Sequence, residues 1–132
     1  MFTKNTSLII PTCDRPQYLK KILNFLFKNK IIFKKIIVID SSLEHNKRKI
    51  KNICASLKVK LIFSEKSTSI QRNVGILNAL NTKFIMFLDD DIIFFKKAFF
   101  EMNKAIKKYK NFDGFCFNII ERKNANLFSL LK

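Results

Sequence analysis

Three consecutive aspartates, Asp89, Asp90 and Asp91, directly follow the apolar run at residues 84–88. Three adjacent carboxylates repel one another, and an apolar run before them makes their surroundings less wet. A divalent cation relieves both problems, because carboxylate oxygens suit hard cations such as Mg2+ and Mn2+. The run therefore indicates a metal site, and a solvated acidic turn stays open as the alternative.

Polar residues also end two earlier apolar runs. They are Thr12, Cys13, Asp14 and Arg15 after residues 7–11, and Asp40, Ser41 and Ser42 at the end of residues 35–40. If these runs are parallel strands, their carboxyl ends meet at one edge of a sheet, where ligands bind in α/β proteins. We therefore expect acids and hydroxyls to converge on one crevice.

The elements that must position these residues alternate along the chain. Apolar runs without period-two alternation predict strands buried on both faces, and apolar residues at helical spacing predict helices between them. Ser67, Thr68 and Ser69 offer hydroxyl caps for the helix at residues 69–80, and Asp14 offers a cap for the first helix. The predicted strands are residues 7–11, 35–40, 59–63, 84–88 and 115–120; the predicted helices are residues 16–29, 45–57, 69–80 and 96–109. This order predicts an α/β, Rossmann-like, doubly wound and mainly parallel sheet in a single domain over residues 1–132.

Two of these predictions name apolar faces. The helix at residues 69–80 is expected to carry Ile70, Val74, Leu77 and Leu80 on its apolar face. The helix at residues 96–109 is expected to bury Phe99, Met102, Ile106 and Tyr109. The strand at residues 84–88 is expected to be buried.

Several classes of site are excluded or weakened. The chain has two glycines, so the glycine-rich loops that bind dinucleotides or triphosphates are absent. Its single histidine, His45, lies in a charged stretch, which favours a solvated side chain over a catalytic one. The three cysteines are widely spaced, which argues against a disulfide framework or a zinc knuckle and favours a reducing compartment.

The net charge of +16 arises from 26 basic and 10 acidic residues. Such a balance attracts polyanions, including nucleic acid and anionic lipid. Only four of the basic residues are arginine, the residue favoured for forked contacts with bases and phosphates. We therefore expect peripheral contact with an anionic membrane and no specific nucleic acid, and a basic nucleic-acid-binding module stays open as an alternative.

Four segments, in this order, resemble the N-terminal half of a GT-A glycosyltransferase of family 2. They are SLIIPTCDRP at residues 7–16, IIVIDSS at residues 36–42, QRNVGI at residues 71–76 and FIMFLDDD at residues 84–91. The resemblance covers residues 7 to about 110. It implies a site for a nucleotide-diphosphate sugar and a divalent metal, Mg2+ or Mn2+.

The resemblance also implies roles for single residues. Pro11, Thr12 and Arg15 resemble the loop under the base and ribose, and Asp40 resembles an acid that reads the base. Arg72 resembles an arginine near the donor diphosphate. Asp89 and Asp91 frame the family's D-x-D signature as metal ligands, with Asp91 the direct ligand and Asp89 or Asp90 nearer the ribose.

The function that follows is transfer of a sugar from a nucleotide-diphosphate sugar to a hydroxyl of a sugar or glycolipid acceptor. We expect a cytoplasmic protein, peripheral at the inner face of the membrane, in cell-envelope polysaccharide synthesis. The family's aromatic residue after the Pro-Thr pair is Cys13 here, and its second acid after strand two is Ser41. The half that carries the general base and the acceptor pocket is expected to be missing, so the alternatives are a donor-binding remnant or a partner chain that supplies the acceptor half.

Overall fold

A computed structural model describes residues 1–79 and 81–118 of the 132-residue chain. The chain divides into two compact units, residues 1–94 and 95–132. The first unit contains a short 3-10 helix, η1 (Phe2–Asn5), and a parallel sheet with its helices. The described part of the second unit contains one helix, α4 (Lys96–Lys108).

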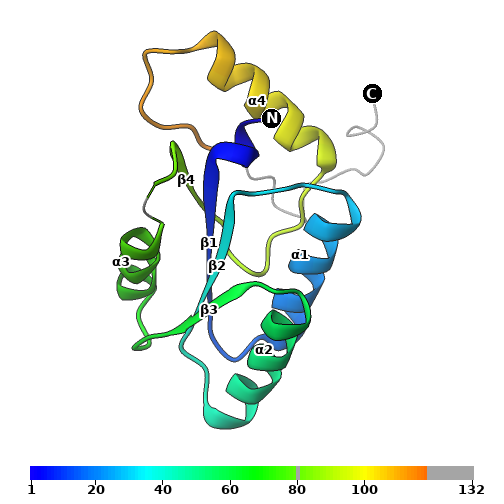
Figure 1. The fold of residues 1–132 in the computed structure, drawn as a ribbon, viewed down its shortest axis with the longest axis vertical. Helices are drawn as coiled ribbons and strands as arrows, with labels where there is room; N and C mark the ends of the chain where they lie inside the picture. Colours follow the sequence, from blue (N-terminus) through cyan, green and yellow to red (C-terminus); the bar gives the residue numbers. More distant parts are fainter. Residues whose placement is uncertain (80, 119–132) are drawn as a thin grey trace. The chain divides into compact units, whose positions relative to one another are not determined.

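The described sheet has four parallel strands in the order β3-β2-β1-β4 (Figure 1). The strands are β1 (Thr6–Thr12), β2 (Lys35–Asp40), β3 (Lys60–Phe63) and β4 (Phe84–Phe87). In the centre of the sheet, Ile9 pairs with Ile37 on one side and with Phe87 on the other. Every residue of β1 is buried, as expected for a central strand covered on both faces.

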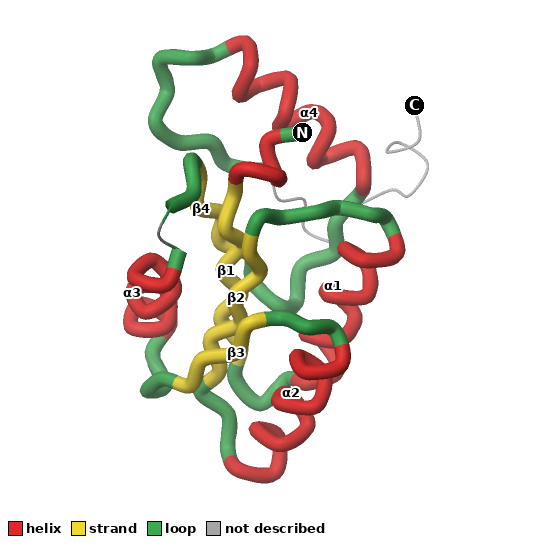
Figure 2. The backbone as a smooth tube through the Cα atoms, viewed as in Figure 1, coloured by secondary structure: helices red, strands yellow, loops and turns green. Residues whose placement is uncertain are grey.

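Helices cover both faces of this sheet (Figure 2). Helices α1 (Pro16–Lys28) and α2 (Glu44–Ser56) lie on one face, and α3 (Thr68–Asn78) lies on the other. Alternate residues of the central strands point to alternate faces. On the α3 face, Ile9, Ile37 and Ile39 form a buried cluster with Ala79. The predicted doubly wound parallel α/β fold is therefore confirmed.

The sheet-facing side of α3 differs from the predicted apolar face. The buried residues of α3 are Gln71 and Gly75, whereas Leu77 is 71% exposed. A Cβ atom at Gly75 would collide with the side chain of Ile9, so the missing side chain is what lets α3 approach β1. The predicted apolar face is right for Val74, which packs against the buried cluster, and wrong for Ile70 and Leu77, which are exposed. Hydrophobicity could not identify Gly75, because the close approach needs a residue without a side chain. Leu80 lies outside the described residues.

The prediction that residues 84–88 form a buried strand is wrong for two positions. Ile85 and Phe87 are 42% and 41% exposed, whereas Met86 between them is buried. The reason is the place of β4 at the end of the described sheet, next to β1 alone. Helix α3 packs mainly against β1 and β2, so it covers the α3 face of β4 only in part.

The predictions for residues 96–120 are confirmed in part. Phe99 and Met102 are buried in α4, but Ile106 is half-buried and Tyr109 is exposed. The expected strand at residues 115–120 is absent over residues 115–118, and residues 119 and 120 lie outside the described residues. Residues 115–118 carry two phenylalanines, and the ring of Phe117 packs edge-to-face on Phe99 instead of joining a sheet.

Candidate functional site

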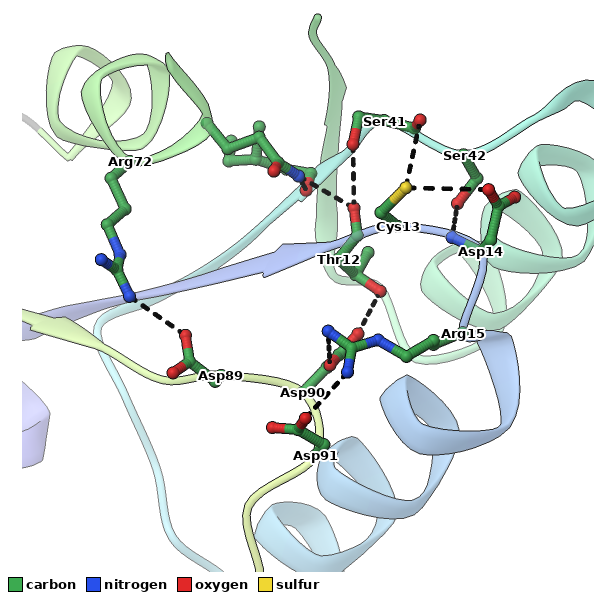
Figure 3. Close-up of polar contacts among 12 residues, drawn as sticks. Thr12, Cys13, Asp14, Arg15, Ser41, Ser42, Arg72, Asp89, Asp90 and Asp91 are labelled. Carbon is green, nitrogen blue, oxygen red and sulfur yellow. Dashed lines mark hydrogen bonds and ion pairs between the residues drawn. The ribbon is translucent and has the colours of Figure 1, made fainter. Parts of the chain in front are cut away.

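The carboxyl ends of β1, β2 and β4 bring their polar residues to one rim of the sheet, with Thr12 at the centre (Figure 3). The Thr12 hydroxyl donates to Oδ2 of Asp90 at 2.6 Å. The Thr12 carbonyl accepts the backbone N–H of Ser41 at 3.1 Å. Thr12 therefore joins the acidic turn after β4 to the loop after β2.

Arg15 holds the acidic turn from the other side. Its guanidinium lies 3.0 Å from Oδ1 of Asp90 and donates to Oδ2 of Asp91 at 2.8 Å (Figure 3). Arg15 is the residue before the first turn of α1, and Pro16 fixes the start of that helix. This placement lets one side chain contact two carboxylates of the same turn.

Asp90 is the buried member of the acidic turn. Its side chain is fully buried, whereas those of Asp89 and Asp91 are about half exposed. Burial raises the pKa of the Asp90 carboxyl, and the Thr12 hydroxyl and the Arg15 charge oppose that rise. The neighbouring charges of Asp91 and Asp89 raise the pKa further. The turn thus combines one protected acid with two accessible ones.

Arg72 pairs with the first aspartate of the turn. Its Nη2 atom donates to Oδ1 of Asp89 at 3.2 Å, and the guanidinium lies 5.8 Å from the ring centroid of Phe87. Arg72 lies in the second turn of α3, which begins after Ser67, whose hydroxyl caps the helix as predicted. A cation near a helix N-terminus opposes the macrodipole, so an anionic partner compensates it.

Asp40 ends β2 as a second buried acid. Its Oδ1 accepts hydrogen bonds from the backbone N–H of Ser42 at 3.0 Å and from the Ser42 hydroxyl. Its Oδ2 is buried without a hydrogen-bond partner in the described structure. Burial raises the pKa of Asp40, and the Ser42 contacts oppose the rise. A buried carboxylate oxygen is costly to leave unpaired, which suits a ligand donor.

Pro11 lies buried in β1, where it pairs with Ile39 of β2. The β4 pairing ends two residues earlier, at Ile9. Proline has no backbone N–H to donate, and Pro11 lies in the part of β1 that pairs with β2 but no longer with β4. The rim begins at the following residue, Thr12.

Asp14 does not cap the first helix, so that prediction is wrong. The residue before α1 is Arg15, whose side chain makes no cap hydrogen bond. Asp14 instead accepts the backbone N–H of Leu43 at 2.9 Å and the side chain of Asn46 at 3.2 Å, both at the start of α2. Its positive φ of 55° turns the carboxylate away from its own helix, and these contacts lower its pKa. Asp14 ties two rim loops together.

Sequence reasoning gave no role to Gln71, although Gln71 belongs to one of the resembling segments. Its buried side-chain amide donates to the carbonyls of Thr12 and Ile39, each at 2.8 Å. The amide therefore links α3 to the ends of β1 and β2. Its only sequence signal was its place in the QRNVGI segment, because the predicted apolar face of this helix does not include position 71.

The predicted metal ligands, Asp89 and Asp91, are not gathered into a cage. Among residues 1–79 and 81–118, no three acidic, histidine or cysteine side chains lie close enough to hold a metal ion. Mg2+ and Mn2+ sites on phosphates need only one or two carboxylates, and two accessible carboxylates on one turn fit that chemistry. Each is paired with an arginine, which such an ion would have to replace.

The predicted site residues thus fall into three connected groups. Thr12, Arg15, Asp90 and Asp91 form one cluster, and Arg72 and Asp89 form a pair. Asp40 belongs to a third group with Ser42. Thr12 connects the first group to the loop after β2, because its carbonyl accepts the N–H of Ser41. Gln71, next to Arg72, contacts the carbonyls of Thr12 and Ile39 and so connects α3 to the same strand ends.

Comparison with known proteins gives a fold match and a family match. A crystal structure of S. aureus TarS matches with a TM-score of 0.62 at 21% sequence identity, over 89% of this chain and 23% of that chain. No curated protein sequence matches the chain. The likeness to TarS supports the GT-A type of α/β fold. The model of Glycosyl transferase family 2 matches residues 7–129, so it takes in all three groups of the rim, and the chain belongs to that family.

Proposed function

We propose that this chain binds a nucleotide-diphosphate sugar at the rim of the sheet and takes part in transferring the sugar to an acceptor hydroxyl. The observation that carries this proposal is the paired arrangement at the acidic turn. Arg15 and Arg72 each hold an accessible carboxylate, next to the buried Asp90. Such a site offers both anionic ligands for a cation and cationic ligands for phosphate.

The base and ribose would lie toward Pro11, Thr12 and Asp40. The unpaired, buried Oδ2 of Asp40 supports this assignment, because it can accept an N–H from a base. Ser42 keeps the carboxyl oriented through two hydrogen bonds to its other oxygen. Asp90 would lie toward the ribose from the opposite side, held by Thr12 and Arg15.

The diphosphate would lie between the acidic turn and Arg72. Asp89 and Asp91 would hold Mg2+ or Mn2+, which neutralises charge on the diphosphate leaving group when bound. Arg72 would add a positive charge fixed by α3, and its Phe87 contact limits the freedom of the guanidinium. Arg15 would orient Asp91 and shield Asp90.

The acceptor would be a sugar or a glycolipid, and the protein would act in the cytoplasm, peripherally at the inner face of the membrane. The net charge of +16 supports contact with anionic lipid. No helix among the described residues is long and apolar enough to cross a membrane. The chain spans 23% of the length of the TarS chain. A second candidate is a donor-binding role beside a partner chain that supplies the acceptor half.

The test of the proposed function is calorimetry with UDP and GDP, in Mn2+ or Mg2+ and then in chelator. We expect nucleotide binding that requires the metal and is lost in Asp91→Asn. Asp113→Asn, which neutralises an exposed acid outside the rim, is the matched control and should bind as the unaltered chain does. Equal binding in chelator, or an equal loss in both variants, would contradict the proposed site.

A further inference from the structure

Helix α4 carries charge on its exposed side. Its buried residues, Phe99 and Met102, lie three apart and share one face. The lysines at positions 96, 97, 104, 107 and 108 are all exposed. Residues 95–118 contain six lysines, no arginine and two acids, a net charge of +4. The exposed face of α4 is therefore strongly basic.

Aromatic side chains are exposed among these lysines. Phe100 is 52% exposed in the middle of α4, and Phe112 is 65% exposed beyond its end. Lys104 lies 4.7 Å from the centre of the Phe100 ring. The transfer of such exposed aromatic rings from water to an apolar environment is favourable. We call Phe95, Phe100, Tyr109 and Phe112 together with the six lysines of residues 96–110 the α4 surface.

The aromatic part of the α4 surface continues past the helix. Tyr109 and Phe112 contact each other edge-to-face at 5.8 Å between ring centres, and Lys108 lies 5.0 Å from the centre of the Tyr109 ring. Aromatic rings at a bilayer interface can lie at the acyl boundary while neighbouring lysines extend their ammonium groups to the headgroups.

We propose that the α4 surface docks this chain on an anionic lipid bilayer. The helix lies in the interface and does not span it. Lysine point charges suit dispersed lipid phosphates, whereas forked recognition of nucleic acid uses arginine, which residues 95–118 lack. This proposal rests on the proposed peripheral location at a membrane, but it requires neither donor binding nor sugar transfer.

A fluorescence experiment tests insertion directly. The chain has no tryptophan, so Phe100→Trp introduces a single reporter into the full chain. Vesicles contain equal parts of phosphatidylcholine and phosphatidylglycerol, or phosphatidylcholine alone, in buffer without nucleotide or metal. We expect a blue-shifted emission with the anionic vesicles, none with the neutral ones, and a smaller shift as salt rises. An unchanged emission with anionic vesicles would overturn the proposal.

Charge reversal tests the location of the surface. Lys97→Glu with Lys107→Glu, which flank Phe100 on the exposed face, should weaken co-sedimentation with anionic vesicles at least about thirtyfold. The matched control, Lys49→Glu with Lys51→Glu, makes the same charge change on exposed positions of α2 and should leave binding nearly unchanged. An equal loss in the two double variants would show that net charge alone acts, which contradicts a defined surface.

Two further readouts separate the α4 surface from misfolding and from the rim. Circular dichroism checks that each variant folds, and metal-dependent UDP binding reports on the rim alone. Loss of vesicle binding with intact UDP binding supports the α4 surface, whether or not the chain transfers sugar. Binding of RNA that is tighter than binding of anionic vesicles at physiological salt would overturn the membrane in favour of nucleic acid.

Discussion

The two buried aspartates at the rim, Asp90 and Asp40, differ in the hydrogen-bond and ion-pair partners of their carboxyl oxygens. Asp90 contacts a hydroxyl and a guanidinium, whereas Asp40 contacts only Ser42 and keeps one oxygen unpaired among the described residues. Sequence pattern placed both residues at the rim, because apolar strands that end in an acid are recognisable. It could not tell which of the three consecutive aspartates is buried, because that depends on the register of β4 against Thr12.

The raised pKa of Asp40 predicts a pH-dependent stability. A carboxyl whose pKa in the folded state exceeds its ordinary value of 3.8 binds its proton more tightly in that state. Its stabilising contribution is therefore present below pH of about 4 and is lost as the pH rises through the folded value. We expect Asp40→Asn to gain stability relative to the unaltered chain across that rise, in urea unfolding measured at several pH values. A stability difference that does not change with pH would contradict this expectation.

Thr12 makes a second residue-scale prediction. Thr12→Val keeps the shape but removes the hydroxyl that donates to Asp90, so a buried carboxylate loses a partner. We expect a loss of about 1–3 kcal/mol in the free energy of unfolding near neutral pH, measured by urea titration. Thr12→Ser retains the donor and should lose less. If the serine variant is as unstable as the valine variant, packing rather than the hydrogen bond accounts for the cost.

At the scale of elements, periodicity predicted where the helices and the first four strands lie, and it predicted two buried residues of α4, but it did not predict which sides of α3 and β4 are covered. In α3 the sheet-facing residues are Gln71 and Gly75, one polar and one without a side chain. The Gln71 amide donates to two strand carbonyls, and the lack of a side chain at Gly75 lets the helix approach Ile9 closely. A hydrophobicity pattern reveals neither of these two reasons for burial. The position of β4 at the edge of the described sheet likewise follows from the order of the strands in the sheet, which differs from their order along the chain.

The close approach of α3 to β1 predicts the effect of Gly75→Ala. The added methyl would collide with the side chain of Ile9, which is fully buried. We expect a loss of about 1–3 kcal/mol in the free energy of unfolding, measured by denaturant titration. Gly114→Ala, where a Cβ meets nothing within 4 Å, is the control and should be nearly neutral. Equal stability of the two variants would show that α3 can shift without cost.

At the scale of the whole molecule, the rim and the α4 surface belong to different units. The rim contacts described above lie within residues 11–91, and the α4 surface lies within residues 95–112. The expected single domain stays a prediction. Composition predicted the polyanion affinity of the chain, but it could not assign that affinity to one helix, because lysines occur throughout the sequence.

The acids beyond the rim predict weak catalysis by the chain alone. Glu101 is exposed and pairs with Lys104, Asp113 is exposed, and Glu121 lies outside the described residues. A positioned general base contributes about 10²–10⁴-fold to rate. We expect the purified chain to hydrolyse a sugar donor slowly and to form little glycoside across an acceptor panel, measured by product chromatography. Rapid multiple-turnover glycoside formation would show that one of these acids serves as the base.

The position of β4 at the edge of the described sheet has a consequence for solubility. Strand β4 reads Phe-Ile-Met-Phe, with two exposed apolar side chains and no charge. Such a strand is prone to pair with copies of itself and aggregate. Lys83 directly precedes the strand, and Asp89, Asp90 and Asp91 begin two residues after its end. Charged residues therefore flank the strand on both sides and oppose its pairing with other copies. The aspartates of the rim would then also keep the protein dispersed, and removing their charges should shorten the time that the chain survives in concentrated solution.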